Sequence, residues 1–194
     1  MKKFIYKIFF IYFLFILISN LQANQIYDDF QLAKNLMIKY FSGCQTCIDD
    51  AINKFTAIVN NSSATLDDIN NAKIEIGWCY CYKKDYNNAE IVFSDLLSNT
   101  NNGLSIYRKE VVLYQLGFVK YLNGKIMEAI DIFKRIKNDF VYTGKDSKVP
   151  LGIYMWGKCL EAAGNTAEAR SKYEEVITDY PEHLAKQIAE REIE

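Results

Sequence analysis

Hydrophobic positions in the chain recur with a period of about 40 residues, a spacing that indicates an internal repeat. Glycines, alanines, aromatic residues and aliphatic residues each return in the same register. Four columns that share one register establish the repeat before any local motif is considered. The residues that define it are Gly77, Ala89, Phe93 and Leu96, then Gly117, Ala129, Phe133 and Ile136, then Gly157, Ala169, Tyr173 and Val176.

Each repeat unit is predicted to be a pair of helices joined by a turn. The alanine, the aromatic and the aliphatic residue follow at intervals of four and three, which places them on one face of a helix. The glycine lies on a preceding helix, where a missing side chain lets another helix approach closely. Turns are expected at Lys84-Asp85, Asn123-Gly124 and Gly164-Asn165, where Gly124 and Gly164 can end the first helix in a left-handed cap. Such a pair completes its core only by stacking on its neighbours.

The third unit, with Trp156-Gly157, Leu160, Gly164, Ala169, Tyr173 and Pro181, resembles the tetratricopeptide repeat (TPR) family. The other two units depart from the family pattern, with Lys120 at a large apolar position and Lys84 at the turn glycine. The family period is about 34 residues, so the longer period here is expected to lengthen helices or loops near 99–103 and 143–148. The resemblance implies an all-α fold, a short solenoid of stacked helix pairs. The alternative is a plain helical bundle with coincidental spacing.

The domain organisation follows from the ends of this pattern. A degenerate helical pair is expected over 24–65, because Ala51, Phe55 and Ile58 repeat the second-helix stripe and Ala33 to Tyr40 supply a partner helix. Three repeats and a C-terminal capping helix fill 66–194. Asp49-Asp50 and Asp67-Asp68 fall where helices begin, so we interpret them as caps and dipole partners. His183, the only histidine, begins the last helix, where a solvated or capping role is expected.

Residues 1–23 have the order of a secretory signal peptide. Three lysines precede an unbroken apolar run over 8–18, and a short polar exit ends at Ala23. The run is shorter than the roughly 20 residues that span a membrane, although an uncleaved N-terminal anchor is the alternative. Either outcome predicts export, with a periplasmic location if the segment is cleaved.

The end of the third unit narrows the resemblance. Tyr180-Pro181-Glu182-His183, followed by Ala185 and Ala189, is similar to the Tyr-Pro ending of exported bacterial envelope TPR proteins. These include the periplasmic coordinator of the Tol-Pal system and the outer-membrane assembly lipoproteins. The resemblance implies an interaction scaffold rather than an enzyme, and it does not identify a partner.

In TPR units the first helices line a concave face, so the resemblance also implies where a partner protein or peptide binds. The positions expected there are largely aromatic, and such side chains suit capture of a peptide or helix. The alternative is that the N-terminal segment or the final helix covers the rings. The proposed groove residues are Ile74, Trp78, Tyr82, Tyr114, Phe118, Tyr121 and Tyr154.

The net charge and the absence of catalytic motifs argue against nucleic-acid binding and against enzymatic activity. The formal charge is −1, and removal of three lysines with residues 1–23 leaves 20 bases against 24 acids, or −4. This balance offers no electrostatic footprint for nucleic acid. No phosphate-binding loop occurs, and no second histidine is present to build a catalytic site. We therefore expect no cofactor and no catalytic residues.

Five cysteines leave four hypotheses open. Export favours disulfides among Cys44, Cys47, Cys79 and Cys81, with Cys159 left over and the connectivity undetermined. A redox role for Cys44 and Cys47 lacks the usual βαβ context. A zinc site from the same four thiolates is weakened by the single spacer between Cys79 and Cys81. Reduced thiols in the core remain a further possibility.

Overall fold

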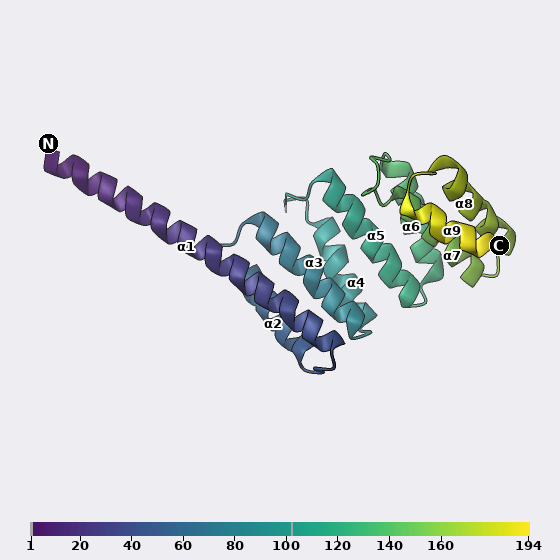
Figure 1. Cartoon of the computed structure of the whole chain (residues 1–194), viewed down its shortest axis with the longest axis horizontal. Helices are drawn as coiled ribbons and strands as arrows, with labels where there is room; N and C mark the ends of the chain where they lie inside the picture. The colour runs from purple at the N-terminus through teal and green to yellow at the C-terminus, as the bar shows by residue number, and fades with distance from the viewer. Residues whose placement is uncertain (1, 102) are drawn as a thin grey trace. The chain divides into compact units, whose positions relative to one another are not determined.

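The computed structural model describes residues 2–101 and 103–194, with the side chains of residue 14 and of 16–101 and 103–194. Within these residues the backbone is helical and contains no strand (Figure 1). The helices are α1 (Lys2–Phe41), α2 (Cys47–Val59), α3 (Leu66–Tyr82), α4 (Tyr86–Ser98), α5 (Ile106–Leu122), α6 (Ile126–Asp139), α7 (Val149–Ala162), α8 (Thr166–Asp179) and α9 (Leu184–Ile193).

The chain divides into two compact units, Met1–Cys79 and Tyr80–Glu194, which are described separately. In the first unit, α1 and α2 form an antiparallel pair (Figure 1). The expected stripe of α2 is its buried face: Ala51, Phe55 and Ile58 are at most 2% exposed. Phe55 packs edge-on against Phe30 of α1 at 5.2 Å between ring centroids. Lys34 of α1 also binds Glu75 of α3 at 2.8 Å.

The predicted signal segment is residues 1–23, and most of its side chains lie outside the described residues. The backbone of α1 passes residue 23 without a break. None of the helices, over the residues described, combines the length and the apolar character of a membrane span.

The acidic pairs lie where the sequence places them, in the first turns of α2 and α3. At α3, the Asp68 carboxylate accepts a hydrogen bond from the Thr65 amide at 2.9 Å. The Asp68 amide donates in return to the Thr65 hydroxyl at 3.1 Å. This reciprocal arrangement is a capping box, and it confirms the interpretation of Asp68 as a capping residue.

In the second unit each helix packs on the one before it, from α4 to α9. The repeat register has a direct physical cause. A Cβ built on Gly117 would lie 2.8 Å from Cε1 of Phe133, and one on Gly157 would lie 2.5 Å from Cε1 of Tyr173. Each glycine therefore makes room for the aromatic ring of the helix that follows it, which explains why these two columns recur together.

The extra length of the repeat lies in the two predicted loops. Residues 99–105 separate α4 from α5, and residues 140–148 separate α6 from α7. The second loop is fastened by Glu110, a buried residue of α5. Its carboxylate accepts hydrogen bonds from the Ser147 hydroxyl (2.7 Å) and from the amides of Lys148 (2.7 Å) and Val149 (3.1 Å). Glu110 thus caps α7, whose own N-cap residue supplies no side-chain bond.

The short turns within the repeats have the expected left-handed conformation, which is unfavourable at one of them. Gly124 and Gly164 adopt left-handed backbone angles, with φ of 74° and 81°. Lys84 takes the same conformation in the first repeat, with φ of 60°. This angle disfavours a residue with a side chain by about 1 kcal/mol.

Candidate partner-binding site

The α5 face carries the aromatic side chains that the sequence singles out. The rings of Tyr114 and Phe118 stack with centroids 6.5 Å apart and planes 11° apart. Tyr114 also contacts Phe133 of α6 at 6.1 Å, and burial raises the pKa of Tyr114 to about 12. Tyr121, one turn beyond Phe118, is half-buried like the other two. Tyr114, Phe118 and Tyr121, spaced by four and three, therefore form a strip along one face of α5 that is partly open to solvent, with Tyr114 supported by Phe133.

The last helix contacts the corresponding face of α7. The Tyr154 hydroxyl donates to Glu192 of α9 at 2.7 Å, and the Tyr154 ring lies 5.6 Å from that of Tyr173. Lys158 binds both Glu161 (2.6 Å) and Glu192 (3.1 Å). Burial opposes the charged form of Lys158, but its hydrogen bonds to these carboxylates outweigh it and raise the pKa. The final helix therefore contacts this face of α7, where Tyr154 and Lys158 stay half-buried.

The other predicted groove residues lie on α3. Ile74 and Trp78 belong to the first unit and are half-buried. Tyr82, the last residue of α3, belongs to the second unit and is 37% exposed. Within the second unit the candidate partner-binding site is therefore the α5 strip of Tyr114, Phe118 and Tyr121, and its role in binding stays a prediction.

Lys120, which departs from the family pattern, is the centre of a charge network. Its side chain is 12% exposed and binds Glu90 of α4 and Glu128 of α6, each at 2.6 Å. Lys125 binds Glu90 at 2.9 Å. Burial would raise the pKa of Glu90, but the two lysines outweigh it and lower that pKa. An ion pair thus occupies the position where an apolar residue is expected, and it joins the first and second repeats.

The cysteines separate into two groups. A disulfide joins Cys44, in the turn between α1 and α2, to Cys47, the first residue of α2, with Cα atoms 5.5 Å apart. Cys79, Cys81 and Cys159 are buried thiols, so the expectation of a disulfide that includes Cys79 or Cys81 is not met. Burial raises the pKa of the Cys81 and Cys159 thiols to about 12 in each case. No group of three or more His, Cys, Asp or Glu side chains arranged for a metal ion occurs among the described residues.

His183 has the capping role rather than a solvated one. It is 3% exposed, and its Nδ1 accepts a hydrogen bond from the Ala185 amide at 3.0 Å. Burial lowers its pKa, against hydrogen bonds to the Ser147 and Lys145 backbones that raise it. A buried imidazole tied to backbone on both sides is structural.

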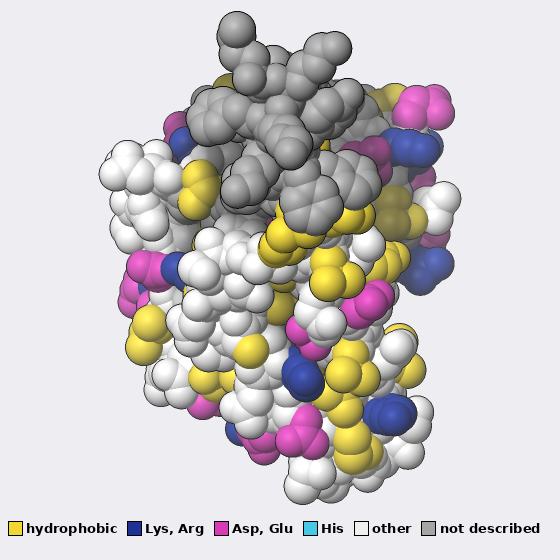
Figure 2. All heavy atoms as spheres, turned by 90° about the vertical axis from the view of Figure 1, so that its left-hand side faces the viewer, with side chains coloured by type: hydrophobic (Ala, Val, Ile, Leu, Met, Phe, Trp, Pro, Cys, Tyr) yellow, Lys and Arg dark blue, Asp and Glu magenta, His cyan; other side chains and the backbone are white. Residues whose placement is uncertain are grey.

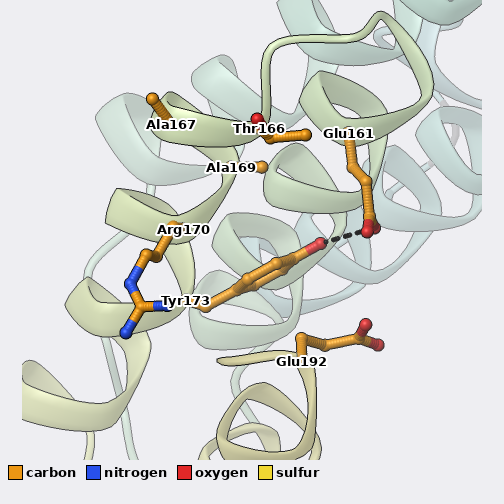
Figure 3. Close-up of a pocket in the computed structure, with 7 residues that line it drawn as sticks. All are labelled: Glu161, Thr166, Ala167, Ala169, Arg170, Tyr173 and Glu192. Carbon is orange, nitrogen blue, oxygen red and sulfur yellow. Dashed lines mark hydrogen bonds between the residues drawn. The ribbon is translucent and has the colours of Figure 1, made fainter. Parts of the chain in front are cut away.

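A cleft of about 340 Å³ lies at the first turns of α8, beside the end of α7 and the last turn of α9 (Figure 3). We call it the α8–α9 cleft. The Tyr173 hydroxyl donates to Glu161 across it at 3.2 Å, and Glu192 projects from the α9 side. The lining residues are Glu161, Thr166, Ala167, Ala169, Arg170, Tyr173 and Glu192.

Sequence reasoning did not find this cleft, because it considered only the first helix of each repeat. The residues that line it belong to α7, α8 and α9, so the stripe of one helix does not contain them.

Comparisons with known proteins agree with this architecture. Residues 111–140 and 152–183, which hold α5–α6 and α7–α8, match the family described as Tetratricopeptide repeat. A search of curated proteins gives no match. The described residues form an all-α solenoid of the TPR type, as predicted, and the match supports the TPR family for these two repeats.

Solved structures share the fold. A kinesin light chain from Podosopora anserina with nearly identical TPR-like repeats is 12% identical, with a TM-score of 0.64 over 87% of this chain and 83% of that one. A single-substitution variant of that protein is 13% identical, with a TM-score of 0.65 over the same shares. MamA is 18% identical, with a TM-score of 0.53 over 71% of each chain. Identities this low show the fold alone, and this fold is typical of protein-interaction scaffolds.

Proposed function

We propose that this chain is an exported scaffold that binds a partner protein through the α5 strip. The observation that carries the proposal is the stacked Tyr114–Phe118 pair, in which Phe133 supports Tyr114 and both rings stay partly exposed. Rigid, pre-stacked rings lose little conformational entropy on binding, so they suit the anchor positions of a protein interface.

Export is supported by the N-terminal segment. Leu14, Ile16, Leu17, Ile18 and Leu21 are between 41% and 71% exposed on α1. Figure 2 shows the end of the molecule that carries this helix, where hydrophobic side chains gather among scattered charged ones. A folded soluble protein rarely leaves such a contiguous patch uncovered, whereas a signal peptide or membrane anchor does so before processing.

The location is tested by cell fractionation with mass spectrometry of the N-terminus. A periplasmic chain that begins at Asn24 supports the cleaved form. A full-length chain in the membrane fraction supports the anchor, and a full-length chain in the cytoplasm contradicts export. The Tyr-Pro ending favours a role like that of the Tol-Pal or outer-membrane assembly TPR proteins, and gene neighbourhood tests that finer proposal.

Partner binding is tested by placing a photoreactive phenylalanine analogue at Phe118. Ile91 is the matched control, because it is 65% exposed on α4 and lies outside the α5 strip. We expect a discrete crosslinked partner from position 118 that is absent from position 91. The same crosslinks from both positions, or none from either, would contradict the α5 strip as the binding surface.

A second candidate function is thiol redox chemistry, favoured by the Cys44–Cys47 disulfide. Alkylation before and after reduction, followed by mass spectrometry of the native protein, distinguishes it from scaffolding. A stable disulfide that does not exchange with added dithiols supports a structural role. Mixed disulfides trapped in a Cys47→Ser variant would support the redox function.

A further inference from the structure

His183 fixes the start of α9 through one nitrogen of its ring. The residue is 3% exposed, and its Nδ1 accepts a hydrogen bond from the Ala185 amide at 3.0 Å. A neutral imidazole has one nitrogen that donates and one that accepts, so the ring proton lies on Nε2. The cap therefore exists only while Nδ1 carries no proton.

The same ring also binds the loop over 140–148. It forms hydrogen bonds with the Ser147 and Lys145 backbones, and the Tyr142 ring lies edge-on to it at 6.2 Å between centroids. The loop is fastened to α5 as well, because the Glu110 carboxylate accepts a hydrogen bond from the Ser147 hydroxyl at 2.7 Å. The imidazole thus connects α9 with a loop that α5 also binds.

Acid disrupts this arrangement at a defined atom. A second proton binds at Nδ1, which then becomes a donor that faces the donor N–H of Ala185. The hydrogen bond is lost, and the first turn of α9 loses its side-chain acceptor. Burial opposes the cation as well and lowers the pKa of His183, although the hydrogen bonds to the loop backbone raise it.

The charges around the ring do not favour its protonation. The Lys148 ammonium lowers the pKa of His183, and among the described residues no carboxylate is hydrogen-bonded to the ring. The Glu110 carboxylate binds the Ser147 hydroxyl and the amides that follow it instead. The other titratable groups on the neighbouring segments are Tyr142, Lys145 and Asp146 in the loop, Asp179, Tyr180 and Glu182 before α9, and Lys186 in α9.

We propose that His183 is an acid-sensitive switch. Protonation of its Nδ1 releases the start of α9 and the loop over 140–148 from each other, while the helices themselves stay folded. The surface that changes carries the exposed side chains of Val141 and Leu184, at 81% and 64%. This inference goes beyond the scaffold function, because the response to pH does not depend on whether the α5 strip binds a partner.

The sign and size of the effect follow from the two states of the ring. Once released, the imidazole has the ordinary pKa of about 6.5, and in place it has a lower one. The contact is therefore intact above about pH 6.5 and weakens as the pH falls. Uptake of one proton on release can raise the population of the released state by up to about 25-fold between pH 7 and pH 5.

The test is hydrogen–deuterium exchange with mass spectrometry on the purified full-length chain at pH 7 and pH 5, with rates corrected for the intrinsic pH dependence of exchange. Peptides over 144–149 and 184–189 should lose protection by about 5- to 25-fold at pH 5, whereas peptides of α4 should keep theirs. His183→Asn retains a capping oxygen that does not titrate, so the difference between the two pH values should disappear. If this variant lacks protection at both pH values, His183→Gln takes its place.

Glu182→Gln is the matched control, because Glu182 is an exposed titratable neighbour of His183 that takes no part in the cap. It should retain the full response to pH. A wild-type change below about twofold, an equal loss of protection in α4, or a response that persists without His183 would each overturn the proposal. Loss of the response in Glu182→Gln would overturn it too, because the carboxylate would then be the titrating group.

No partner is added in this experiment. Its outcome is therefore independent of whether a crosslinked partner is found at Phe118.

Discussion

Removal of the Glu110 carboxylate should destabilise the second unit by about 3 kcal/mol. Glu110 is 3% exposed, and its carboxylate accepts three hydrogen bonds, two of them from amides at the start of α7. A hydrogen bond to a charged group contributes about 1.5–3 kcal/mol, and a lost helix cap costs about 1 kcal/mol. Desolvation of the carboxylate itself offsets part of this gain, so the net loss is smaller than the sum of the three bonds.

The assay is urea denaturation of Glu110→Ala followed by circular dichroism, with Glu182→Ala as the exposed control. Ser147→Ala and the double variant complete a cycle, which should give a coupling energy of about 1 kcal/mol between Glu110 and Ser147. Hydrogen exchange at the Lys148 and Val149 amides should accelerate in Glu110→Ala. A loss within about 0.5 kcal/mol of the control would refute the reasoning, because that is the size expected of an ordinary surface substitution.

Other residues give three more predictions. Lys84→Gly should raise the free energy of unfolding by up to about 1 kcal/mol in urea denaturation, because glycine adopts the left-handed angle without strain. The stability of the wild-type chain should fall as the pH drops below about 6.5, because burial holds the folded-state pKa of His183 below its ordinary value and the unfolded chain binds the proton more readily. Iodoacetamide at pH 8 should leave Cys81 and Cys159 unmodified in the native protein, since burial blocks access and raises both pKa values to about 12.

Each prediction has its own control. Gly124→Ala should have the opposite sign to Lys84→Gly, and a gain in stability there would contradict the argument from backbone angle. His183→Asn retains a capping side chain that does not titrate, so it should lose the part of the pH dependence that belongs to histidine. Alkylation of Cys81 or Cys159 without denaturant would show that the thiols are accessible.

The fold was predictable because the contacts between its helices recur at a fixed spacing in the sequence. Gly117 must face Phe133, and Gly157 must face Tyr173, so the contact that holds two helices together appears in the sequence as a pair of columns. The loop positions followed from the same count. The Glu110 cap did not, because a carboxylate that binds amides 38 and 39 residues away leaves no local pattern.

The candidate site was predictable only in part. The register placed Tyr114 and Phe118 on the same helix face one turn apart, and they stack as expected of neighbours. It could not show that Glu192 of α9 binds the Tyr154 hydroxyl, because that depends on how α9 packs on α7, which the spacing does not determine. The ion pair of Lys120 with Glu90 could not be predicted either, because the two residues belong to different repeats and their contact depends on how the repeats pack.

The loop over 140–148 has a consequence for how the second unit unfolds. It is held on one side by Glu110 of α5 and on the other by His183, which begins α9 and whose hydrogen bonds go to the Ser147 and Lys145 backbones. In a simple repeat array each unit senses only its immediate neighbours, and the ends can fray one unit at a time. Here a single loop contacts both α5 and α9, although α6, α7 and α8 lie between them in the chain. Unfolding of α9 therefore removes contacts from the loop that Glu110 of α5 also binds. The helices from α5 to α9 should therefore unfold in one cooperative transition rather than one by one from the C-terminal end.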